Sequence, residues 1–128
     1  MRTGLSMADD AASGWLAVVD DIRQVVNNLH GPRPSLSGAA YHCQQAAEKL
    51  VKSVLSKSAI PFPKSHDIAA LVELLPSDHR LKGHLKGLEK LTPYGVAYRY
   101  PSDEKWEIPS AAAIETWLDE INAIRSMI

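Results

Sequence analysis

Apolar residues recur at three- and four-residue steps between residues 36 and 54, the spacing that places them on one side of an α-helix. The apolar positions are Leu36, Ala39, Ala40, Cys43, Ala47, Leu50, Val51 and Val54. The opposite side carries Gly38, Tyr41, His42, Gln45, Glu48, Lys49, Lys52 and Ser56. The pattern predicts a central helix that ends near Ser58 and buries one face. The second face is either an ordinary solvated surface or a contact surface for a second subunit or an anionic ligand.

The same periodicity predicts four further helices and no β-strand. The first spans about residues 8–28, and residues 1–7 are expected to fray, with the true start at Met1 or Met7. Two short helices follow at 67–75 and 81–91, and a last helix runs from about Ser110 to the end. Residues 91–101 hold three tyrosines and one arginine between prolines, which predicts an ordered loop over the bundle. We therefore expect an all-α protein.

The composition limits the class of protein further. A chain of 128 residues with 45% hydrophobic residues suits one domain, residues 1–128, with one core. The formal net charge of −1 excludes a uniformly basic nucleic-acid-binding surface, so any anion site must be local. The lone cysteine, Cys43, lies on the apolar face and predicts a buried thiol in a reducing compartment. Neither a membrane span nor a signal peptide is recognisable, so we expect a cytoplasmic protein.

Four polar residues of the central helix share one side: His42, Gln45, Lys49 and Lys52. Their ammonium, amide and imidazole groups can donate hydrogen bonds to a phosphate, a ribose or a base. If Tyr98 and Arg99 reach this side, the cations and the aromatic ring form a cradle for a phosphate and a stacked base. The alternative is that Glu48 and the lysines form surface ion pairs worth about 0–1 kcal/mol each.

Other polar residues are expected to have structural roles. Asp21 flanks the apolar stripe of the first helix and is expected to cap or pair with a neighbouring helix. Glu48 is expected to form ion pairs with the lysines near it. His66 and Asp67 are adjacent, as in metal phosphohydrolases, but no further ligands stand at matching distances. We expect the His66 ring to tie its link to a neighbouring helix and Asp67 to occupy the first turn of the next helix. No metal or cofactor site is indicated, because the five histidines are scattered.

Several segments together resemble HEPN domains. They are Tyr41–Lys52 (Tyr-His-Cys-Gln-Gln-Ala-Ala-Glu-Lys-Leu-Val-Lys), His66-Asp67-Ile68, Leu91-Thr-Pro-Tyr94 and Tyr98-Arg-Tyr-Pro101, with Trp15 and Asp21-Ile22 in the first helix. The resemblance implies an up-and-down bundle of four main helices with a short additional helix. It also implies homodimers with a polar groove between subunits, and frequent pairing with a minimal nucleotidyltransferase, often as a toxin–antitoxin couple. Nucleotide binding and metal-independent RNA cleavage are the two functions attached to the family.

The RNA-cleaving members carry an arginine, four to six residues and then a histidine. Arg99 is followed by Tyr-Pro-Ser-Asp-Glu-Lys-Trp106, which contains no histidine. Arg23 and His30 have the required spacing of six residues, but they lie at the end of the first helix and not near the Tyr-Arg-Tyr-Pro segment. The resemblance therefore implies a non-catalytic homodimer that binds a nucleotide or RNA phosphate, a partner nucleotidyltransferase, or both. The alternatives are a ribonuclease toxin that uses Arg99 with His42 or His66, and a purely structural dimerisation module.

Overall fold

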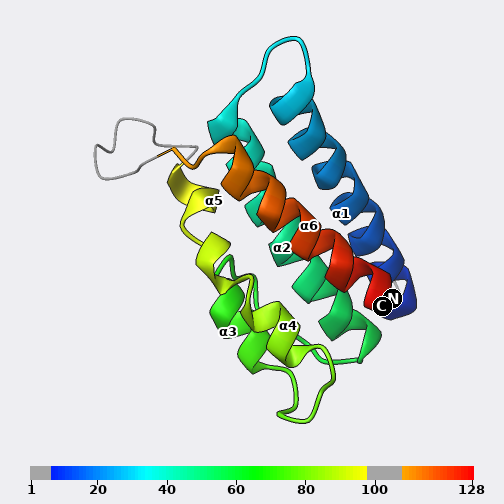
Figure 1. Cartoon of the computed structure of the whole chain (residues 1–128). Coiled ribbons are helices and arrows are strands. Elements are labelled where there is room, and N and C mark those ends of the chain that lie inside the picture. The colour runs from blue at the N-terminus through cyan, green and yellow to red at the C-terminus, as the bar shows by residue number, and fades with distance from the viewer. Residues whose placement is uncertain (1–6, 98–107) are drawn as a thin grey trace.

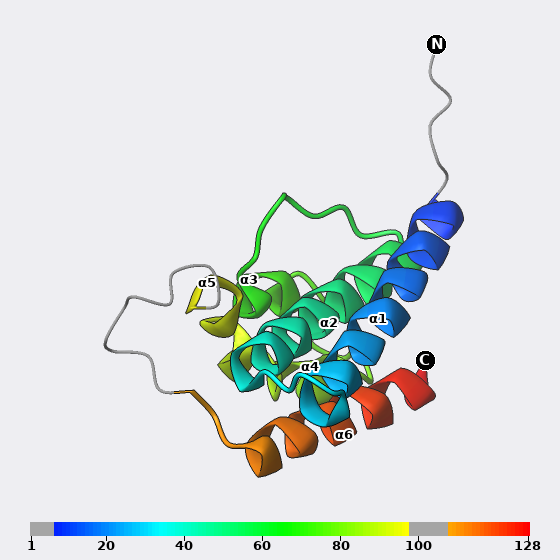
Figure 2. The ribbon, with the colours of Figure 1, turned by 90° about the horizontal axis from the view of Figure 1, so that it is seen from above.

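Three long helices form most of the bundle. The computed structural model describes residues 7–97 and 108–128, with α1 at Met7–His30, α2 at Leu36–Lys57 and α6 at Ala111–Met127 (Figure 1). Helix α2 is central, because it contacts α1, α3, α5 and α6. Figure 2 shows α1 on one side of α2 and α3 on the other, while α6 crosses beneath them. The start of α1 and the end of α6 lie at the same end of the bundle (Figure 1).

The fourth position of the bundle is filled by a succession of short helices. These are α3 (Ile68–Glu73), α4 (Lys82–Lys86), the 3₁₀ helix η1 (Glu89–Leu91) and α5 (Tyr94–Ala97). The described residues contain no strand, so the predicted all-α bundle is confirmed. The helix expected over 81–91 is divided at Gly87, the C-cap of α4, since glycine disfavours a continuous helix.

The expectation of a loop over 91–101 was wrong for residues 94–97. Pro93 precedes the first residue of α5, and a proline is compatible with a helix start because it removes only an amide that would lack an intrahelical partner. The remainder of that stretch, including Tyr98 and Arg99, lies outside the described residues.

Side-chain caps set where three helices begin. Ser35 accepts a hydrogen bond from the Gly38 amide at 3.0 Å, and Ser110 accepts one from the Ala113 amide at 3.1 Å. Asp67 is the N-cap of α3, one position before the helix, where its carboxylate accepts from the amides of the first turn. The sequence analysis had placed Asp67 inside that turn. Helix α2 ends at Lys57, and Ala59, two residues later, adopts a left-handed φ of 58°.

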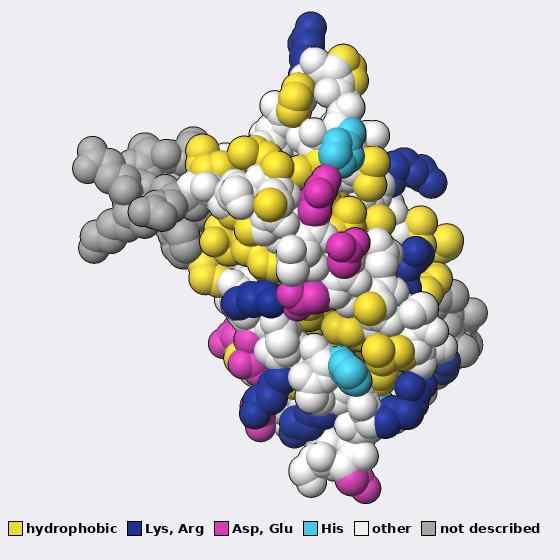
Figure 3. Space-filling model, viewed as in Figure 1, with side chains coloured by type: hydrophobic (Ala, Val, Ile, Leu, Met, Phe, Trp, Pro, Cys, Tyr) yellow, Lys and Arg dark blue, Asp and Glu magenta, His cyan; other side chains and the backbone are white. Residues whose placement is uncertain are grey.

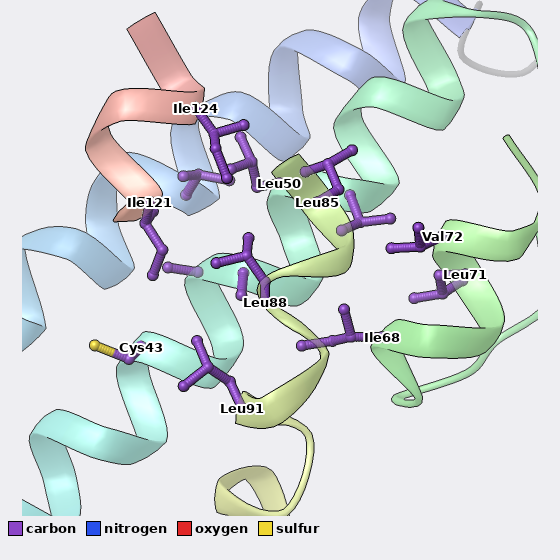
Figure 4. Packing of buried hydrophobic residues seen from close by; sticks show 14 of the residues in the cluster. Cys43, Leu50, Ile68, Leu71, Val72, Leu85, Leu88, Leu91, Ile121 and Ile124 are labelled. Atoms are coloured by element: carbon purple, nitrogen blue, oxygen red, sulfur yellow. The ribbon is translucent and has the colours of Figure 1, made fainter. Parts of the chain in front are cut away.

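The hydrophobic core surrounds α2 (Figure 4). Leu50 of α2 meets Leu85 of α4, Leu88 between α4 and η1, and isoleucines of α6. Cys43 is a free thiol at 0% exposure, and burial raises its pKa to about 12. All predicted apolar positions of α2 are buried except Leu36, which is partly exposed. No helix among the described residues combines the length and the apolar character that crossing a bilayer requires.

The second face of α2 is less solvated than its pattern suggested. Gly38, Glu48 and Ser56 are buried, although they were assigned to the polar face. A Cβ at Gly38 would lie 2.7 Å from the side-chain oxygen of Asn28, so this glycine permits the close approach of α1. The prediction failed because α2 has neighbours on nearly every side, so only a narrow strip of its surface reaches water.

Candidate functional site: a polar stripe along α2

The partly exposed strip of α2 consists of Tyr41, His42, Gln45, Lys49 and Lys52, and is called the α2 stripe below. Two buried carboxylates lie beside it, one on each flank. Asp21 comes from α1 and is 5% exposed, and Glu48 comes from α2 itself and is 3% exposed. A buried charge is costly unless it is paired and hydrogen-bonded, so the partners of these two groups define the site.

Asp21 is held by two residues of the stripe. Lys49 Nζ donates to Asp21 Oδ2 at 2.7 Å, and His42 Nδ1 lies 2.9 Å from Asp21 Oδ1. Burial alone would raise the pKa of Asp21, but the hydrogen bonds and charges of His42 and Lys49 outweigh it and lower that pKa below its ordinary value. The carboxylate is therefore ionised and only accepts, so His42 must donate through Nδ1–H. In the neutral ring, Nε2 then keeps its lone pair.

Glu48 has two partners on α2 and one in the link before α3. Lys52 Nζ donates to Glu48 Oε2 at 3.0 Å, and Gln44 Nε2 donates to Glu48 Oε1 at 3.1 Å. His66, in the link before α3, brings Nδ1 to 3.1 Å from Oε1 while 77% of its side chain remains exposed. The sequence analysis expected a ring contact from His66 to a neighbouring helix, and Glu48 of α2 is that contact.

Gln44 joins this group of residues to α5. Its side chain is 0% exposed, and its Oε1 accepts from Gln45 Nε2 at 2.7 Å. A Cβ at Gly95 of α5 would lie 2.7 Å from Gln44 Oε1, so only glycine allows α5 to approach this closely. Gln44 therefore links the hydrogen bonds of the stripe to the packing of α5 on α2.

Aromatic rings border the stripe at both ends. The rings of Tyr41 and His42 have centroids 5.1 Å apart with an edge-to-face angle of 76°. Lys52 Nζ lies 6.0 Å from the centroid of Phe62, at the outer limit of a cation–π contact. Phe62, in the link after α2, is partly buried against the core.

The expected ligand residues of α2 are thus brought together, but each cation already has an internal partner. The formal charges of Asp21, Glu48, Lys49 and Lys52 cancel, which leaves the two histidines to set the net charge of the described cluster. Asp67 caps α3 and takes no part in it. Tyr98 and Arg99 lie outside the described residues. Within the described residues, no group of three histidine, cysteine or acidic side chains is arranged to hold a metal ion.

Two residues of the site, Gln44 and Gly95, were missed from the sequence. Gln44 stands four residues before Glu48, a spacing at which helical side chains meet, and that signal was available. Gly95 had no comparable signal, because its importance arises from contact with α2 across a distance of about 50 residues in the chain.

A mostly helical bundle around a central helix with buried, paired carboxylates defines the class of protein. The family model described as the HEPN domain matches residues 20–128. The match covers most of the chain, including α2, its paired carboxylates and the helices around them, and the chain therefore belongs to the HEPN family. Neither the curated proteins nor the solved structures contain a significant match.

Proposed function

We propose that this HEPN protein is a non-catalytic homodimer that uses the α2 stripe to bind a phosphate of a nucleotide or RNA, a partner minimal nucleotidyltransferase, or both. The observation that carries the proposal is the pairing of the stripe with two buried carboxylates. Asp21 and Glu48 hold two lysines and two histidines at hydrogen-bond distance. Such pairs contribute little to stability by comparison with apolar packing, so their presence favours a role in recognition.

The held side chains retain donors that can face a ligand. An ammonium has three N–H groups, and Lys49 and Lys52 each use one in the contacts described. Lys49 is 35% exposed at its side chain, and His42 is 25% exposed. Their positions are set before a ligand arrives, which reduces the conformational entropy lost on binding.

A phosphate needs more positive charge than the described cluster supplies. Because two carboxylates offset two lysines, the extra charge must come from protonated histidines or from another cation. Arg99 follows the end of α5 by two residues in the sequence, and α5 packs on α2 at Gln44. We propose that Arg99 supplies this charge and that Tyr98 stacks on a base. The toxin–antitoxin setting follows from the family resemblance.

Binding and assembly can be tested on the purified protein. We expect light scattering to give twice the mass of one chain, and calorimetry to detect ATP, GTP or a short RNA. Lys49→Gln should weaken that binding about tenfold, the loss of one charge-assisted hydrogen bond. Lys64→Gln is the matched control, since Lys64 is exposed and outside the stripe. A monomer that gives no heat with any ligand and does not co-purify with a nucleotidyltransferase would contradict the proposal.

Ribonuclease activity is a second candidate because of one contact, His42 with Asp21. A buried carboxylate on Nδ1 orients an imidazole and leaves Nε2 to take a proton, as in hydrolases with a His–Asp pair. In this candidate His42 Nε2 would take the 2′-hydroxyl proton and the 2′-oxygen would attack the adjacent phosphorus, with Arg99 stabilising the phosphate, while the departing 5′-oxygen would take a proton from water. RNA that is cleaved by the wild type, and not by His42→Asn, would support it. Intact RNA after long incubation would favour the binding function.

A purely structural dimerisation module is the third candidate. In that case Gln45→Ala and Lys49→Ala would change the stability of the dimer without altering the binding of any ligand.

A further inference from the structure

His42 is the residue of the α2 stripe whose hydrogen-bonding character depends on its protonation. Its Nδ1 lies 2.9 Å from Oδ1 of Asp21, a carboxylate of α1 that is 5% exposed. Because Asp21 is ionised and only accepts, the ring proton of neutral His42 must lie on Nδ1. The tautomer is therefore set by the packing of α1 on α2, before any ligand approaches the stripe.

The second ring nitrogen of His42, Nε2, is the one that a ligand can reach. The two nitrogens of an imidazole point in widely divergent directions, so a ring that holds a buried carboxylate through Nδ1 turns Nε2 away from it. The His42 side chain is 25% exposed, and Nε2 makes no hydrogen bond or ion pair with any residue of 7–97 or 108–128. The charged groups beside the ring are Asp21 of α1 and Lys49 of α2, which contact each other at 2.7 Å.

A neutral His42 disfavours an anion at this end of the stripe. Its Nε2 presents a lone pair, and a lone pair beside a phosphate oxygen places two acceptors together with no hydrogen between them. The formal charges of Asp21 and Lys49 cancel, so no net charge offsets this repulsion. A proton added to Nε2 changes both conditions, because the ring becomes an N–H donor and the local charge becomes positive. The Nδ1–H contact with Asp21 is kept, as a charge-assisted hydrogen bond.

We infer that binding of a phosphate to the α2 stripe is coupled to the uptake of one proton by His42. The inference rests on the function proposed above and adds its regulation, since the bound state holds more protons and a fall in pH strengthens binding. Histidine changes its charge between about pH 5 and 8, so the coupling acts near neutrality. Lys49 and the protonated ring, held on the two oxygens of one carboxylate, then both donate to the phosphate.

Lysines and arginines elsewhere on the surface would bind an anion differently. On the face that α6 covers, acidic side chains lie along that helix, and Lys and Arg side chains gather toward the lower end of the molecule (Figure 3). Lysine and arginine keep their charge between about pH 6 and 8, so an anion held by them alone binds without proton uptake. Proton uptake therefore distinguishes binding at His42 from general attraction to a cationic surface.

Calorimetry of the full chain with a short RNA that lacks terminal phosphates tests the coupling, because the charges of its phosphodiesters do not change near neutral pH. Titrations at about pH 8 in buffers of different ionisation enthalpy report the number of protons taken up. We expect about one proton per chain, and an affinity about tenfold weaker at pH 8 than at pH 7, as for one imidazole that must be protonated. His42→Asn should remove both effects, although its amide can still donate to Asp21.

Two further histidine variants locate the proton. His84→Asn removes an exposed imidazole from α4 and should leave both the affinity and the proton uptake unchanged. His66→Asn removes the imidazole that contacts Glu48 and should keep the proton uptake. Uptake that persists in His42→Asn, or that disappears in His66→Asn instead, would overturn the inference.

The tautomer of His42 provides a test that needs no variant. Long-range nitrogen–proton NMR spectra of the free protein should show the neutral ring protonated on Nδ1, and a proton on Nε2 would overturn the inference. RNA that binds the wild type without proton uptake would contradict the coupling and leave the proposed binding function intact. Absence of binding at both pH values would contradict the binding function and the coupling together.

Discussion

Lys49 of α2 donates a 2.7 Å hydrogen bond to a carboxylate oxygen of Asp21, a residue of α1 that is 5% exposed. The other oxygen of the same carboxylate contacts His42, which lies about two turns before Lys49 on the same side of α2. A single buried charge on α1 thus sets the positions of two stripe residues. The following predictions test this relationship and the packing that surrounds it.

Replacing Asp21 by alanine should destabilise the protein. The substitution leaves His42 and Lys49 without their buried partner, and we expect the free energy of unfolding to fall by about 1–3 kcal/mol, toward the lower end because the Lys49 ammonium can turn to water. Urea denaturation measures the change. Asp20→Ala is the control, since Asp20 is exposed on the same helix and should change stability by at most about 0.5 kcal/mol. Equal effects of the two substitutions would show that the Asp21 contacts contribute nothing.

The lowered pKa of Asp21 predicts a dependence of stability on acid. The folded-state pKa lies below the ordinary value of 3.8, so the unfolded chain binds the proton first as the pH falls. The stability contributed by Asp21 is therefore complete above about pH 5, begins to decline near 3.8 and is lost as the pH falls through the folded-state pKa. Unfolding free energies from pH 6 down to about 2.5 should show this decline in the wild type and a shallower one in Asp21→Asn. Superimposable slopes would contradict the assignment.

Gly95→Ala should separate α5 from α2. The added Cβ would lie 2.7 Å from Gln44 Oε1 and 2.8 Å from its Cδ, and Gln44 is wholly buried. We expect a loss of about 1–3 kcal/mol, as for overpacking of a core. Gly83→Ala is a close control in α4, because no atom lies within 4 Å of the added Cβ there. It should stabilise the protein by about 0.4–1 kcal/mol through helix propensity and unfolded-state entropy. Thermal unfolding of both variants measures these changes in stability.

Ala59→Gly should stabilise the end of α2. Ala59 has a φ of 58°, a conformation that an L-residue with a Cβ adopts at a cost and glycine does not. The relief of this strain exceeds the added entropy of the unfolded chain, so we expect a gain of about 0.5 kcal/mol. Ala69→Gly, inside α3, should instead lose about 1 kcal/mol. A loss in both variants, measured by denaturant unfolding, would mean that the left-handed conformation carries no strain.

Cys43 should be unreactive in the folded protein. Its thiol is 0% exposed and its pKa is raised to about 12, so both access and the thiolate fraction are low at neutral pH. Iodoacetamide labelling, followed by mass spectrometry, should be negligible in buffer and complete in denaturant. Rapid labelling of the native protein, at the rate of a free thiol, would show that the core around α2 opens readily.

Much of the fold could be predicted from the sequence, because helix formation and burial of an apolar stripe depend on residues a few positions apart. The spacing of Ala39, Cys43 and Leu50 identified α2 and its buried face. The HEPN resemblance was also present in the sequence, in local strings such as Tyr41–Lys52.

The sequence by itself therefore determined which residues of each helix are apolar and which are polar. Only the tertiary structure decided that Glu48 and Ser56 are buried, that Asp21 pairs with Lys49, and that Gly95 lies on Gln44. A helical wheel orders the residues around one axis but does not say how many neighbours surround that axis. Asp21 and Lys49 are 28 positions apart in the chain, and only the packing of α1 on α2 brings them together, as the packing of α5 on α2 brings Gly95 to Gln44.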